Sequence, residues 1–79
     1  MIVTENQSRI IEVLLEVFKE KSLPAPQLSA ETVLDQLGLE SLDFAQAVIR
    51  MEEITGKDPF ASGAEYEIKT LRDFAATYD

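Results

Sequence analysis

The string LGLESLD, at residues 37–43, is the most distinctive local pattern in the sequence, and it places Ser41 where a helix is expected to begin. The chain contains no cysteine and no histidine, which excludes thiolate nucleophiles, imidazole bases and the common zinc ligand sets. A serine nucleophile would then need another base, and no lysine is near Ser41 in the sequence. The acidic residues also fail the spacing of a calcium-binding loop. These residue types leave few catalytic candidates, and we expect no catalytic residue and no metal site.

Ser41 is expected to be the N-cap of a helix that runs from Leu42 to about Ile54, because a serine hydroxyl can accept a hydrogen bond from the first amides of a helix. Glu40 and Asp43 would lie close to the positive end of the helix dipole. A glycine two residues after Ile54 is a typical stop signal. The motif therefore spans the junction between a loop and this helix.

One narrow arc of this helix is polar and consists of Asp43, Gln46, Arg50 and Glu53. Apolar residues cover most of the remaining surface, which is more than one core face needs. We therefore expect Leu42 and Ile49, which flank the arc, to remain exposed. Arg50 is expected to interrupt the arc with a positive charge that a docking partner would meet, which leaves the arc close to neutral.

The first helix is expected to start with a capping box formed by Thr4 and Gln7 and to run to about Lys21. Its apolar stripe consists of Ile10, Ile11, Leu14, Val17 and Phe18. Two prolines then stop the helix, so residues 22–37 are predicted to form a long connection. Such a loop needs apolar anchors, and the candidates, with a short helical turn among them, are Leu28, Val33, Leu34 and Leu37.

The C-terminal part of the chain is predicted to hold one short helical turn and one regular helix. Tyr66 and Ile68 are assigned to the short turn, after a proline turn at Pro59 from which Phe60 packs back into the core. A capping box of Thr70 and Asp73 opens the last helix. Its buried face consists of Leu71, Phe74, Ala75 and Tyr78, and both Phe74 and Val48, from the preceding long helix, are expected to be core residues.

The string at residues 37–43 resembles the attachment motif of acyl carrier proteins, in which a leucine and a glycine precede an acidic residue, the modified serine and a leucine. The resemblance extends over nearly the whole chain, because the order of helices, long loop, motif and proline turn is also similar. Glu40 stands where the family usually has aspartate. The resemblance implies an all-α, acyl-carrier-like four-helix bundle with three main helices, one short helix and a long first loop.

The same resemblance implies that Ser41 carries a covalent phosphopantetheine arm donated by coenzyme A, and that the protein is a carrier and not itself an enzyme. It implies that Glu40, Leu42, Asp43 and Ile49 contact partner enzymes. Those partners would be a phosphopantetheinyl transferase, a ligase that loads acyl or aminoacyl groups, and acyltransferase or synthase clients. The thiol that holds the cargo would belong to the arm, so the lack of cysteine is no obstacle.

Differences from fatty-acid carriers favour a specialised lipid, glycolipid or secondary-metabolite pathway over housekeeping fatty-acid synthesis. Gln46 stands where many of those carriers have glutamate, and Arg50 breaks the same arc. Two other hypotheses remain open from the sequence. An aminoacyl or peptidyl carrier would share the serine and the arm, and an unmodified helical interaction module would use the exposed apolar residues alone.

Charge and length set the remaining expectations. Fifteen acidic and seven basic residues give a net charge of −8, which disfavours nucleic acid and anionic membranes as partners. The start of the chain lacks a secretion signal, and no apolar run reaches membrane-spanning length. We expect a monomeric, cytoplasmic protein without membrane insertion. Its 79 residues are expected to form a single acyl-carrier-type domain, 1–79, because they suffice for one core.

Overall fold

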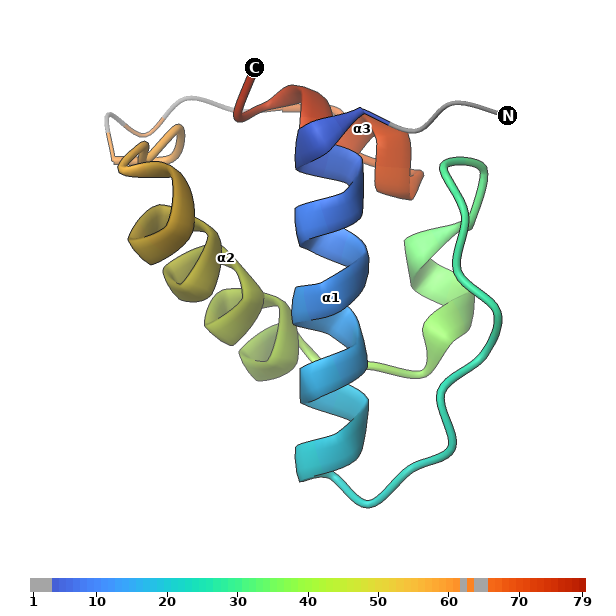
Figure 1. Cartoon of the computed structure of the whole chain (residues 1–79). Coiled ribbons are helices and arrows are strands. Elements are labelled where there is room, and N and C mark those ends of the chain that lie inside the picture. The colour runs from blue at the N-terminus through green and yellow to red at the C-terminus, as the bar shows by residue number, and fades with distance from the viewer. Residues whose placement is uncertain (1–3, 62, 64–65) are drawn as a thin grey trace.

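The computed structural model describes residues 4–61, 63 and 66–79, and within them all regular structure is helical. The elements are α1 (Glu5–Glu20), the 3₁₀ helix η1 (Leu34–Leu37), α2 (Ser41–Thr55) and α3 (Leu71–Ala76). Helix α1 stands in the middle and packs against both α2 and α3, while the long loop and η1 lie on the side of α1 away from α2 (Figure 1). None of the described helices has the length and apolar character needed to cross a membrane. The predicted all-α class is confirmed.

The predicted caps of α1 and α3 are both present. The Thr4 hydroxyl accepts from the Gln7 amide at 3.1 Å, and the Gln7 side chain accepts from the Thr4 amide at 3.3 Å. Thr70 and Asp73 form the equivalent box at α3. Each box satisfies amides that have no partner inside the helix, so these two starts are encoded locally.

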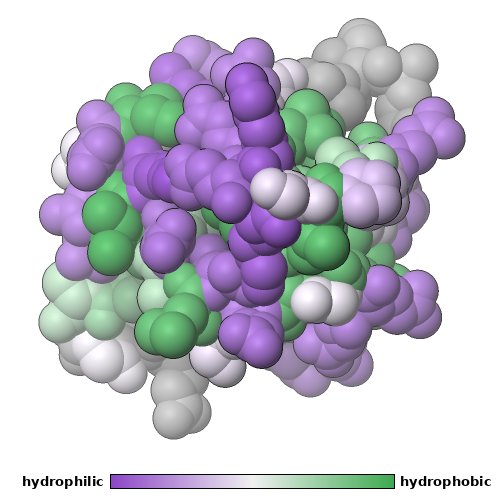
Figure 2. Space-filling view, turned by 90° about the horizontal axis from the view of Figure 1, so that it is seen from below, coloured by the Kyte–Doolittle hydropathy of each residue, from purple (hydrophilic) through white to green (hydrophobic). Residues whose placement is uncertain are grey.

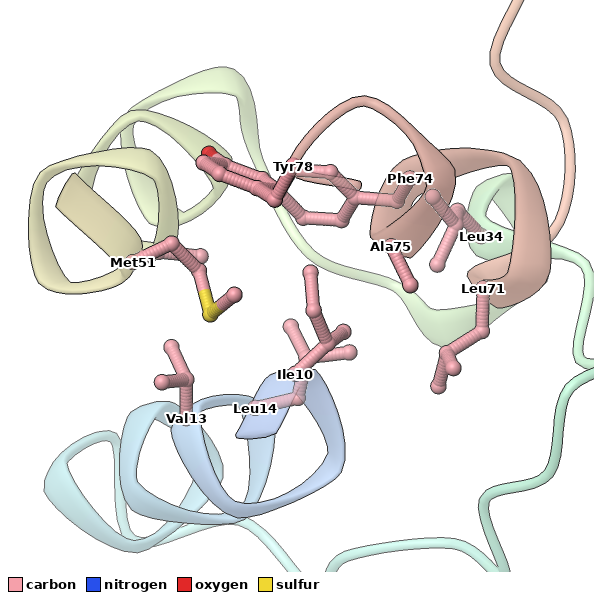
Figure 3. Close-up of a cluster of buried hydrophobic side chains, with 10 residues drawn as sticks. Ile10, Val13, Leu14, Leu34, Met51, Leu71, Phe74, Ala75 and Tyr78 are labelled. Carbon is pink, nitrogen blue, oxygen red and sulfur yellow. The ribbon is translucent and has the colours of Figure 1, made fainter. Parts of the chain in front are cut away.

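The core gathers side chains from α1, α2, η1 and the last turns of the chain around one apolar centre (Figure 3). Its buried residues are Ile10, Val13, Leu14, Leu34, Ala47, Met51, Leu71, Phe74, Ala75 and Tyr78. Phe74 is buried as predicted, whereas Val48 is only partly buried and packs against the cluster. Burial raises the pKa of Tyr78 to about 12, because the ionised phenolate would lose its contact with water.

The long loop is attached to the start of α3 mainly through its backbone. Leu34 donates its amide to the carbonyl of Lys69, and Leu71 donates to Thr32, both at 2.9 Å. Leu34 is buried, as predicted for an anchor. The prediction that Val33 is an apolar anchor is wrong, because its side chain is exposed while its backbone forms a β-bridge with Thr70. The backbone pairing therefore turns this valine away from the core.

The short helical turn predicted around Tyr66 and Ile68 is wrong for the described residues, since residues 66–69 are not helical. The bridge between Thr70 and Val33 and the hydrogen bond that the Lys69 carbonyl accepts from Leu34 require an extended backbone here. Tyr66 instead packs edge-on against Phe60 with ring centroids 5.3 Å apart. Among the described residues the short helix is η1, within the long loop, and residues 62 and 64–65 lie outside the described part.

Phe74→Ala should remove about 3–5 kcal/mol from the free energy of unfolding, because it deletes a ring from the buried centre and leaves a cavity. Denaturant unfolding followed by circular dichroism measures this loss. Leu42→Ala is the matched control, since Leu42 is 75% exposed and its truncation should change stability by no more than about 0.5 kcal/mol. Equal stabilities of the two variants would contradict the assignment of Phe74 to the core.

Candidate functional site

Ser41 is exposed and is the first residue of the 15-residue helix α2. Gly38, which has φ +74, ends η1, and Glu40 is the extended N-cap of α2. The prediction that Ser41 is the N-cap is therefore wrong by one residue. Asp43 supplies a cap instead, because its carboxylate accepts from the Glu40 amide at 2.8 Å. The Ser41 hydroxyl is thus placed at the positive end of α2 without serving as its cap.

Asp43 is held by two donors on the same oxygen. Its Oδ2 accepts from Nζ of Lys21 at 2.6 Å as well as from the Glu40 amide. The hydrogen bond from Lys21 lowers the pKa of the Asp43 carboxyl, the amide acts in the same direction, and the pair raises the pKa of Lys21. A role for Asp43 as a partner contact stays a prediction, and such a partner would compete with Lys21.

Helix α2 exposes large apolar side chains along its length, beginning directly after Ser41. Leu42 is 75% exposed and Ile49 is 55% exposed, as predicted, and Ile54 adds a third exposed side chain near the end of the helix. Figure 2 views the molecule from the end where α1 stops and α2 starts, and there apolar areas are interspersed among hydrophilic side chains. The role of Leu42, Ile49 and Glu40 in partner binding stays a prediction.

Arg50 lies in the seam between α2 and α1 rather than on a partner-facing arc. Its guanidinium contacts Glu16 at 3.2 Å and Glu20 at 2.6 Å, and its side chain is only 24% exposed. The expectation that a docking partner would meet this positive charge stays a prediction, and the two ion pairs reduce the net charge that such a partner would meet. Two carboxylates of α1 offset the charge, because α2 crosses α1 with this edge turned inward.

An apolar cavity of about 250 Å³ begins one helical turn after Ser41, at Phe44. It lies between α2, η1, the segment before α3, and α3 itself. Its lining consists of Leu34, Asp35, Phe44, Val48, Phe60, Ile68 and Phe74. The partial burial of Val48 has its reason here, since this side chain faces the cavity as well as the core.

Sequence reasoning missed the partners of Asp43 and Arg50 and also missed the cavity. In the sequence, Lys21 is recognisable only as a cation near the end of the first helix. Any lysine is favourable at such a position, so the sequence does not indicate its contact with Asp43. The spacing of Glu16 and Glu20 indicates only that both lie on one solvent-facing side of the first helix, and it does not indicate their ion pairs with Arg50. Residues 21 and 43 are far apart in the chain, so their contact depends on helix packing and not on local pattern.

A family model described as "Phosphopantetheine attachment site" matches residues 8–78 of the chain. No curated protein and no solved structure matches it significantly. Domains of the matched family carry a phosphopantetheine group covalently on a serine and are not catalytic themselves. They interact with phosphopantetheinyl transferases and with synthases.

Proposed function

Because the chain belongs to the phosphopantetheine attachment site family, and is therefore a carrier and not an enzyme, we propose that Ser41 is the residue that bears the arm. The observation that carries this assignment is the exposure of Ser41 at the first position of α2. A transferase must reach the hydroxyl to move phosphopantetheine onto it from coenzyme A. A serine inside a packed helix face would not allow that approach.

The surroundings of Ser41 fit the charge of the group. A phosphodiester is an anion, and the N-terminus of a long helix carries a partial positive charge and free amide donors. Lys21 offsets the carboxylate of Asp43 at the same turn. The arm itself supplies the thiol on which cargo is held as a thioester. The chain contributes the attachment oxygen, the favourable charge and the surfaces that partner enzymes contact.

Ser41→Ala should abolish the gain of one phosphopantetheine in mass when the chain is incubated with coenzyme A and a phosphopantetheinyl transferase. Since Glu40 is the N-cap, the variant should lose no more than about 0.5 kcal/mol of stability. Ser8→Ala, at an exposed position of α1, should be loaded like the wild type. Intact-protein mass spectrometry decides the matter, and an alanine variant that still gains the arm would refute the site.

The cavity favours an acyl cargo over an aminoacyl or peptidyl cargo. Its volume is about 250 Å³, and all but one of its lining residues are apolar. An alkyl chain that enters it leaves water, which is favourable in proportion to the apolar area buried. A peptide unit in the same place would lose hydrogen bonds to water without replacing them.

Val48→Phe tests this cargo assignment by filling the cavity. In the wild type, a medium-chain acyl group on the arm should raise the melting temperature above that of the free-thiol form, because the bound chain stabilises the folded state. The variant should lose that increment, even if the larger ring itself costs about 1–3 kcal/mol. Ala45→Phe, at an exposed position of α2, should keep it. An increment that survives in Val48→Phe would contradict cargo burial at this site.

A specialised acyl-transfer pathway is favoured by the small number of outward-facing acidic side chains on the first turns of α2. With Arg50 and Asp43 turned to α1, the outward side of the first turns presents Leu42 and Gln46, both exposed. Partners that recognise carriers by a row of acidic side chains would find little charge there. We expect Leu42 and Ile49 to provide most of the contact area, with Glu40 at its edge.

Gln46→Glu should raise kcat/KM with a synthase that docks through basic side chains by up to about fivefold at low salt, which corresponds to one exposed ion pair. Gln36→Glu adds the same charge at an exposed position of η1 and should have no such effect. Initial rates of condensation at two salt concentrations provide the measurement. Wild-type protein that serves housekeeping fatty-acid enzymes as well as their own carrier would rule out the specialised role while leaving the carrier function intact.

A further inference from the structure

Lys21 and Asp43 form an ion pair that joins the end of α1 to the first turn of α2. Nζ of Lys21 lies 2.6 Å from Oδ2 of Asp43, and the two side chains are 30% and 13% exposed. The same oxygen accepts from the amide of Glu40 at 2.8 Å. One carboxylate oxygen therefore connects the lysine to the residue that directly precedes Ser41.

The backbone at Lys21 is itself held in one geometry. After α1 the chain makes the two hydrogen bonds of a Schellman motif, from Ser22 to Lys19 and from Leu23 to Phe18, both at 3.0 Å. Ser22 has φ +57, a left-handed conformation that a residue other than glycine adopts only at a cost in free energy. Such a conformation persists where surrounding contacts fix it. The backbone of Lys21, the C-cap of α1, is therefore fixed in position, and its side chain extends from there to Asp43.

The pair also changes the charge at the attachment position. Glu40 and Asp43 would otherwise place two negative charges at the turn that contains Ser41, where a phosphodiester adds further negative charge. Lys21 offsets the charge of Asp43 while leaving its oxygen as an acceptor for the Glu40 amide. The carboxylate can then order the first turn without opposing the incoming phosphate.

We infer that Lys21 is a positioning residue for the loading of Ser41: through Asp43 it orders the start of α2 and balances the local charge, so that the transferase meets a preformed site. The inference rests on the proposed function, because it concerns transfer of phosphopantetheine to that serine. It assigns to Asp43 an internal role in place of a direct contact with the transferase.

Steady-state loading of the full chain with coenzyme A and a broad-specificity phosphopantetheinyl transferase tests this role. Lys21→Met should lower kcat/KM by about fivefold at low salt, with the difference shrinking as salt screens the pair. The loss should lie in kcat more than in KM, because the misordered turn still docks. Lys21→Arg should restore loading, and Lys19→Met, the same charge change two residues earlier on α1, should load like the wild type.

A double-mutant cycle with Asp43→Asn separates the internal role from a partner contact. The amide oxygen of asparagine can still accept from Glu40 but cannot form the ion pair, so the two changes should be strongly non-additive. If Asp43 contacts the transferase directly, Lys21→Met would free its carboxylate and raise kcat/KM. That rise, or additivity in the cycle, would overturn the inference.

Two further measurements separate an effect of Lys21 on loading from a loss of folding and from an error in the assignment of Ser41. Hydrogen exchange of the Glu40 amide should accelerate in Lys21→Met and not in Lys19→Met, at a temperature where both variants are fully folded. Unchanged exchange and unchanged loading in Lys21→Met would refute the positioning role. Loading that persists in Ser41→Ala would instead refute the proposed attachment site, so the two failures are distinguishable.

Discussion

The two-sided burial of α1 is the constraint on which the rest of the structure depends. Ile10 and Leu14 are fully buried, and the helix packs against α2 and α3 at the same time. A chain of this length can form only one hydrophobic core. Every other element must therefore pack against α1 directly, or against a helix that packs against α1. Helix α3 has only six residues, and it stays in place because its apolar face packs on this central helix and its start pairs with the long loop.

The parts of the fold that could be predicted are those whose causes are local. Capping boxes and apolar stripes depend on residues three or four positions apart, and the predicted bounds of α1 and α2 agree with the structure within a residue or two at each end. The path of residues 66–69 and the outward direction of Val33 depend on pairing between segments more than thirty residues apart. No periodicity near Tyr66 contains that information.

In the candidate site, too, the features with local causes could be predicted and those that depend on helix packing could not. The position of Ser41 at the start of a helix followed from the motif, and the exposure of Leu42 and Ile49 followed from an apolar surface too wide for one core face. The surroundings of Asp43 and Arg50 depend on the angle at which α2 crosses α1. That angle is set by the packing of side chains such as Met51, so the internal ion pairs become visible only in three dimensions.

The walls of the apolar cavity differ in stiffness. Phe44, Val48 and Phe74 belong to α-helices, where a displaced side chain must move with a hydrogen-bonded turn. Phe60 and Ile68 belong to residues outside regular helices, so their displacement breaks no helical hydrogen bond and requires less free energy. The helical side of the cavity is therefore expected to be rigid, and the side formed by Phe60 and Ile68 is expected to move more easily. If the proposed acyl cargo enters this cavity, different chain lengths would be accommodated by movement of that side, while α2 and the residue at its start keep the same orientation toward a partner enzyme.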